Sequence, residues 1–189
     1  MNGILYLGLS VMLTGPLHDA WVPTDVPTAQ HYWAKSHVRL EQREGPVVFL
    51  KGVYAHPGRD KNAYWGMPLA LNSTWWLHTH GAPTSGDKVL ETREVVDGQV
   101  RYPLAWLERE QKLAVVTGMI KLKLQHLSGL EALRARRDLT IQKVFKRERL
   151  VLIDAAPGVP LRELVQALRQ HSAIARAELD LLYHFAQAH

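Results

Sequence analysis

The sequence predicts an α+β protein in which a small β-rich part precedes a mixed part with two helices. Strand signals dominate from Val38 to about Gln111, with one candidate helix at 104–111. From residue 112 onward the patterns follow the order strand, helix, strand, strand, helix, strand. Two right-handed β-α-β crossovers in that order make a ferredoxin-like split sandwich, an antiparallel sheet with two helices on one face. The predicted organisation is therefore a β-rich N-terminal domain at 21–111 and a ferredoxin-like domain with a C-terminal tail at 112–189.

The first 20 residues resemble a secretory signal peptide. The apolar run 4–13 is too short to span a bilayer, and Gly15-Pro16 breaks it before a candidate cleavage site after Ala20. No Lys or Arg precedes the run, so a buried N-terminal strand stays open as the alternative. Residues 21–30, which contain Pro23 and Pro27, are expected to form a linker or an extended arm.

The elements expected in the N-terminal part are short strands. The apolar runs 47–50 and 75–77 predict two of them, and 55–68, which contains two glycines and two prolines, predicts a long loop between them. Residues 95–100 predict a hairpin, because Asp97-Gly98 accepts the positive φ of a type I′ turn. All six tryptophans lie in this part, where we expect them to serve as core or interface anchors.

The first four elements of the C-terminal part follow directly from local patterns. Ile120, Leu122 and Leu124 alternate with lysines, which indicates a strand. Ser128 and Glu131 have the spacing of a capping box, so we expect a helix from there to about residue 137. Residues 140–146 and 149–155 then predict two strands.

The second helix and the last strand have the strongest patterns. Pro160 suits the first position of a helix because its missing N–H is not needed there. The apolar stripe that follows has the spacing of a helix packed on a sheet: Leu161, Leu164, Val165 and Leu168. Residues 175–182 predict a strand with Ala177, Leu179 and Leu181 toward the core, which places Glu178 and Asp180 together on the opposite face.

Composition excludes several classes of site. The chain has no cysteine, which rules out disulfides and thiolate metal sites, and 47% of its residues are hydrophobic, as in a globular protein. His78-Thr79-His80 has a spacing that can chelate a metal, but no third ligand is near in the sequence, so polar surface is the favoured interpretation. The sequence has no glycine-rich phosphate loop and no nucleophile elbow. We therefore expect no metal, no cofactor and no catalytic residues.

The charge is concentrated in one half of the chain. Residues 112–189 carry 13 Lys and Arg against 7 Asp and Glu, whereas residues 1–111 carry 10 against 11. A basic half of this kind suits nucleic acid, a membrane surface or an acidic protein, or is simply a solvated surface. RNA-binding versions of the ferredoxin-like fold stack bases on aromatic residues of central strands, and 149–154 contains no aromatic residue.

Short motifs in the C-terminal half resemble the propeptide of subtilisin-like serine proteases. They are 141–146, the Leu-x-x-x-Leu segment 164–168, the turn 171–174, and Glu178-Leu179-Asp180. In that family the two acidic residues cap the N-termini of two parallel helices on the protease, where free N–H groups and the helix dipole favour a carboxylate. The family's tail then adds a strand to the protease in its substrate groove.

The resemblance implies a protease-binding set of nine residues near the C-terminus: Glu178, Asp180, Tyr183, His184, Phe185, Ala186, Gln187, Ala188 and His189. Because no protease follows in the sequence, the chain resembles an external chaperone of a subtilisin- or kexin-type protease that lacks its own propeptide. The tail after Asp180 is longer than is usual in the family, so either His189 or a residue near Ala186 reaches the catalytic serine.

These patterns predict a secreted or periplasmic protein without catalysis of its own. Its expected partner is a subtilisin-like serine protease, with no nucleic acid bound and no stable insertion into a membrane. Two other functions stay open: a nucleic-acid-binding module that uses the basic half, and an envelope assembly or adaptor protein in which the C-terminal domain is only structural.

Overall fold

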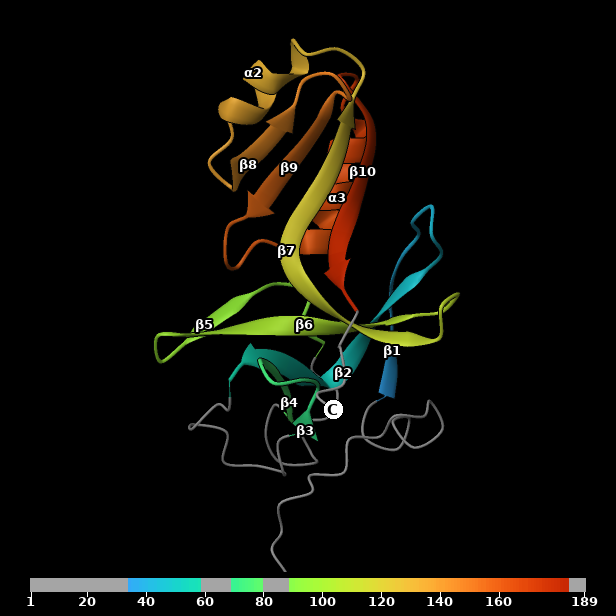
Figure 1. Cartoon of the computed structure of the whole chain (residues 1–189), viewed down its shortest axis with the longest axis vertical. Coiled ribbons are helices and arrows are strands. Elements are labelled where there is room, and N and C mark those ends of the chain that lie inside the picture. The colour runs from blue at the N-terminus through green and yellow to red at the C-terminus, as the bar shows by residue number, and fades with distance from the viewer. Residues whose placement is uncertain (1–33, 59–68, 80–88, 184–189) are drawn as a thin grey trace, which may run out of the picture.

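The computed structural model describes residues 34–58, 69–79 and 89–183 (Figure 1). The predicted signal peptide, the linker, most of the loop 55–68, His80 and the tail 184–189 lie outside these ranges. The strands and helices in chain order are β1 (Ala34–Leu40), β2 (Val47–Pro57), β3 (Leu69–Ala70), β4 (Trp75–Thr79), β5 (Glu94–Val96), β6 (Gln99–Leu107), β7 (Lys112–Leu124), α2 (Gly129–Arg134), β8 (Leu139–Phe145), β9 (Leu150–Ala155), α3 (Leu161–Gln170) and β10 (Ile174–Leu182).

The protein is mostly β. Within the described residues, nine strands form one antiparallel sheet in the order β3-β4-β2-β6-β7-β9-β8, with β1 paired to β2 and β10 paired to β7, and β5 adds a hairpin to β6. The prediction of an α+β fold with a ferredoxin-like C-terminal domain is therefore wrong, although each strand and helix expected after residue 112 is present. Local patterns predict which residues form strands, but they do not show that strands from both halves pair in one sheet.

Strand β7 joins the two halves. Its first residues pair with β6, from Lys112 opposite Leu107 to Val115 opposite Leu104, and its later residues pair with β9 and β10. At 13 residues it is the longest strand described, and it bends between these two regions (Figure 1). A single strand shared in this way makes the two halves of the described structure one continuous sheet.

The bend in β7 lies at Gly118. Val116 pairs with Leu181 and Ile120 with Leu179, so three residues of β7 oppose the single residue Asp180 of β10, as in a β-bulge. Gly118 has φ of +90°, and a Cβ there would lie 2.5 Å from Nε of Arg93. Only glycine has both the conformation and the space for this position.

Arg93 connects the segment before β5 to the C-terminal half. Its guanidinium lies 3.0 Å from Oδ1 of Asp154 on β9, and its side chain is only 11% exposed. Its carbonyl accepts the N–H of Gly158, and the carbonyl of Glu91 accepts the N–H of Leu161 at the start of α3. These contacts hold the segment 89–93 against the loop between β9 and α3.

Two apolar clusters stabilise the sheet. The larger contains residues of β7, β9 and β10 and the inner faces of both helices, including the predicted α3 stripe of Leu161, Leu164, Val165 and Leu168. The smaller lies among β2, β4, β6 and the start of β7, with Trp106 and Val115 buried in it. The prediction that Ala177 and Leu179 face the core is confirmed, and Leu181 packs against the larger cluster while partly exposed.

Other local predictions have mixed outcomes. The hairpin at Asp97-Gly98 is confirmed, with positive φ at both residues. The candidate helix 104–111 is wrong, because β6 continues through Leu107 into a turn and its residues pair with β2 and β7. The capping box at Ser128 is not formed: α2 ends at Arg134 and Glu131 instead pairs with that arginine.

Among the described residues, no helix is long and apolar enough to cross a membrane.

Candidate partner-docking site

The predicted acidic pair lies on the sheet face opposite to the helices. Because α2 and α3 pack on one face of β7, β9 and β10, the alternate side chains of these strands point to the other side, here called the outer face. Its central row is formed by Glu178, Lys121 and Leu152, which are direct cross-strand neighbours. Further side chains of the outer face are Met119, Lys123, Leu150, Asp154, Arg176 and Asp180.

Asp180 is the more accessible of the two carboxylates. Its side chain is 36% exposed, and its Oδ1 atom lies 2.5 Å from Nζ of Lys121 on the neighbouring strand. The hydrogen bond to Asp180 raises the pKa of Lys121 above its ordinary value. The lysine is therefore protonated at neutral pH and holds the Asp180 carboxylate by an ion pair across the two strands.

Glu178 is in a different environment. Its side chain is 17% exposed, and both carboxylate oxygens have partners: the backbone N–H of Arg43 at 3.2 Å and Nε of Arg176 at 3.3 Å. Sequence periodicity predicts the same environment for both carboxylates, because it places them on one face of one strand. The structure shows that they are not equivalent, since a loop from the N-terminal half covers Glu178.

That loop is 41–46, between β1 and β2. Besides the Arg43 contact, Oε1 of Gln42 accepts the N–H of Leu179 at 2.5 Å. The loop thus satisfies the N–H of Leu179 on β10, and a partner strand could bond to that N–H only by displacing Gln42. Sequence reasoning missed this contact because Gln42 and Leu179 are 137 residues apart and no local pattern relates them.

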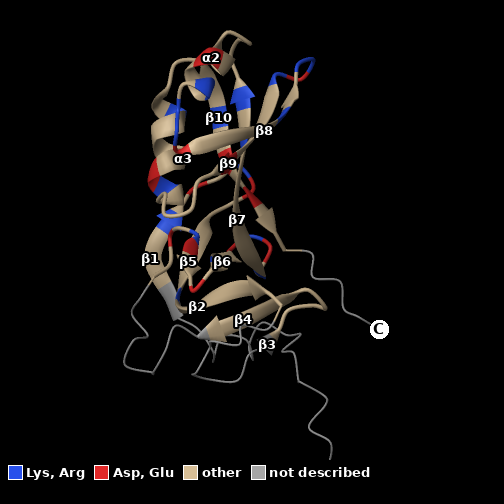
Figure 2. Cartoon of the chain, turned by 90° about the vertical axis from the view of Figure 1, so that its left-hand side faces the viewer, with Lys and Arg blue, Asp and Glu red and all other residues tan. Residues whose placement is uncertain are grey.

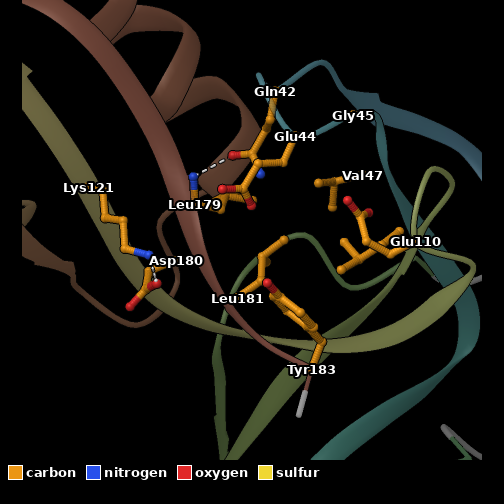
Figure 3. A pocket seen from close by; sticks show the side chains of 11 residues that line it. Gln42, Glu44, Gly45, Val47, Glu110, Lys121, Leu179, Asp180, Leu181 and Tyr183 are labelled. Atoms are coloured by element: carbon orange, nitrogen blue, oxygen red, sulfur yellow. Dashed lines mark hydrogen bonds and ion pairs between the residues drawn. The ribbon is translucent and has the colours of Figure 1, made fainter.

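A pocket of about 90 Å³ lies between this loop, the turn after β6 and β10 (Figure 3). Three carboxylates line it, those of Glu44, Glu110 and Asp180. Its apolar lining residues are Val47, Leu107, Leu179, Leu181 and Tyr183. Figure 3 shows Lys121 and Asp180 on one side of the pocket and Tyr183 below Leu181. The pocket therefore combines apolar walls with an acidic rim at the junction of the two halves.

Tyr183, the last residue described, packs within the protein. Its ring contacts the larger apolar cluster and lies 5.9 Å from Nζ of Lys112. Tyr183 and Phe185 are the tyrosine and the phenylalanine of the predicted protease-binding set, and either could fill a side-chain pocket of a partner. Because Tyr183 already has contacts within the protein, Phe185 is the better candidate for that role. Phe185 and the other predicted tail residues, 184–189, lie outside the described residues.

The histidine pair of β4 is partly described. His78 is 2% exposed, its ring stacks on Tyr54 with centroids 5.4 Å apart, and His56 lies edge-on to it at 6.3 Å. In the described part of the chain, no group of three or more His, Cys, Asp or Glu side chains could hold a metal ion. His78 is therefore a buried core residue rather than the exposed polar residue that its sequence context predicts.

These features define a mostly β protein whose outer sheet face and adjoining pocket bring charged side chains from both halves together. Residues 106–187 of the chain are similar to the family described as the open reading frame 2 N-terminal domain. The matched segment begins at the end of β6 and includes every strand and helix from β7 to β10, so it contains Glu178 and Asp180. No characterised protein and no solved structure matches the chain.

Proposed function

We propose that this chain is an external folding chaperone and temporary inhibitor of a secreted subtilisin-like serine protease. The observation that carries the proposal is the position of Asp180: it lies half-exposed on the outer face, three residues before the chain reaches its tail. A carboxylate there is available to accept N–H groups at a helix N-terminus of a partner, while the tail extends toward the partner's groove. The resemblance of 141–146 and 164–180 to propeptides supports the same partner.

Chaperone activity in this proposal follows from mass action. The outer face binds the folded or nearly folded protease and not the unfolded chain, so binding shifts the folding equilibrium of the protease toward its native state. The tail then blocks the active site until the chain dissociates or is digested. A chain with this role acts outside the cytoplasm, in the periplasm or after secretion, where its protease folds.

The direct test is refolding in trans. The full chain is added to a denatured subtilisin-like protease that is encoded beside it and lacks a propeptide, and the recovered activity is measured after the chain is removed. We expect a higher yield of active protease, and inhibition while the chain is present. The full chain is the correct reagent, because β7 pairs with β6 and residues 112–189 share their sheet with the N-terminal half. A protease that refolds equally well alone and is not inhibited would refute the proposal.

The two carboxylates should contribute unequally to binding. Replacing Asp180 with alanine removes charge-assisted hydrogen bonds to the partner, and we expect binding of the protease to weaken by about fivefold or more, or roughly 1 kcal/mol. Glu178→Ala should have the smaller effect on binding, because its carboxylate already accepts the N–H of Arg43. Binding can be measured by inhibition titration.

A matched control is available at Asp138, which is comparably exposed and pairs with Arg136 on the turn between α2 and β8. Asp138→Ala removes one surface carboxylate without changing the outer face, so it should leave inhibition unchanged. Equal inhibition by the Asp180→Ala, Glu178→Ala and Asp138→Ala proteins would remove the acidic pair from the proposed interface.

A further inference from the structure

A cluster of cations lies at the end of the sheet opposite to Asp180. The turn between β8 and β9 carries three of them, and neighbouring strand positions add two more. We call this set the basic tip: Lys123, Lys143, Lys146, Arg147 and Arg149. Figure 2 shows Lys and Arg along the projecting hairpin formed by β8 and β9. Glu148 is the acidic residue within the turn.

Internal contacts hold the basic tip in place. Nζ of Lys123 donates to the carbonyl of Glu148, and the Arg149 guanidinium donates to the carbonyl of Gln125 at 2.6 Å. Nζ of Lys143 lies 4.9 Å from the centre of the Phe145 ring. Lys146 and Arg147 are exposed at the turn. Three of the five charges, those of Lys123, Lys143 and Arg149, are thus held by contacts within the protein, which reduces the entropy that a binding partner must offset.

The outer face is consequently polarised along β10. Arg176 lies near the basic tip, where it is the cross-strand neighbour of Lys123, and Asp180 lies at the acidic pocket. They lie four positions apart on the strand, or about 13 Å. Arg176 is paired with Glu178 and Asp180 with Lys121, so the opposite charges of the two ends come mainly from Lys146 and Arg147 at the tip and from Glu44 and Glu110 at the pocket.

The surface between these two ends favours a protein over a nucleic acid. Leu150 and Leu152 are partly exposed there, which is typical of the centre of a protein interface. A nucleic acid that lay along the outer face would meet the carboxylate of Asp180, which carries the same sign of charge as a phosphate. The ring of Phe145, on which a base could stack, already has the ammonium group of Lys143 over it.

We infer that the basic tip is a second docking surface that binds a carboxylate-rich segment of a partner protein. Opposite charges at its two ends would allow the outer face to bind such a partner in one orientation only, since the reversed orientation places like charges together. This inference goes beyond the proposed function, because it holds for any protein partner with a carboxylate-rich segment.

Fluorescence anisotropy with two labelled probes tests, on the full chain, whether the basic tip binds a carboxylate-rich segment. The probes are a ten-residue polyglutamate peptide and a thymidine decanucleotide of similar charge, each titrated at 50 and 150 mM salt. We expect the peptide to bind more tightly than the decanucleotide at both salt concentrations. The double variant Lys146→Glu/Arg147→Glu should weaken peptide binding at least tenfold.

The matched control is Arg134→Glu/Arg137→Glu, which makes the same change in charge at exposed positions in and just after α2. It should alter peptide binding less than twofold. Equal losses of peptide affinity in both double variants would show that net charge alone attracts the peptide. Unchanged affinity in the Lys146→Glu/Arg147→Glu variant would exclude the basic tip as the binding surface. Either result overturns the inference. Tighter binding of the decanucleotide would also overturn it and would identify a nucleic-acid surface. Because no protease is used, none of these outcomes bears on the proposed chaperone function, which the refolding experiment tests separately.

Discussion

Replacing Gly118 with alanine is expected to lower the free energy of unfolding by about 2–4 kcal/mol. An alanine at φ of +90° has an unfavourable backbone conformation that costs about 1–2 kcal/mol. Its Cβ would also lie 2.5 Å from Nε of Arg93, so that side chain must move away from Asp154. Moving it leaves two largely buried charges without their partner, which adds to the loss. Urea denaturation of the full chain measures the change.

Gly98 supplies the control for backbone strain. Its φ of +77° is similar, but a Cβ there would meet no atom within 4 Å. Gly98→Ala should therefore cost only the conformational part, about 1–2 kcal/mol. A second comparison makes Gly118→Ala in a protein that already carries Arg93→Ala. There the Cβ no longer clashes with Arg93, so the two substitutions together should lower the free energy of unfolding by less than the sum of their separate effects. Equal losses at Gly98 and Gly118 would contradict the proposed packing of Arg93 on β7.

Deleting residues 185–189 is expected to remove most of the inhibition of the partner protease. In the proposed complex these residues form a strand in the substrate groove, and Phe185 occupies a side-chain pocket. The loss of several backbone hydrogen bonds and one buried aromatic side chain should raise the inhibition constant by about 100-fold or more. Steady-state inhibition assays with the full and truncated chains measure this ratio.

The same truncation should affect folding assistance less than inhibition. Asp180 and the rest of the outer face are retained, so the truncated chain still has the surface that favours the native protease. Its own stability should be unchanged, because the deletion begins after Tyr183, whose ring contacts the larger apolar cluster. A control chain in which 185–189 are replaced by a Gly-Ser segment of equal length separates sequence from length. Full inhibition by either altered chain would show that the tail does not occupy the active site.

Local sequence patterns predicted most of the elements of this protein. The apolar stripe of α3, the alternation in β10 and the turn at Asp97-Gly98 are each determined by residues close together in the chain, so they are readable without tertiary contacts. The patterns were weaker where competing interactions decide the outcome. Leu104 to Leu107 form a strand because β2 and β7 lie on either side of them, and no local signal reports those neighbours.

For the candidate site, the sequence by itself determined that Glu178 and Asp180 share one face of a strand that leads into the tail, because side chains alternate along β-structure. Only the tertiary structure decided that Asp180 stays accessible beside Lys121 while the loop 41–46 covers Glu178. It also decided that β7 joins both halves into one sheet through the bulge at Gly118. The physical reason is the same in each case: these outcomes depend on pairing and packing between residues far apart in the chain, whose energies no local pattern encodes.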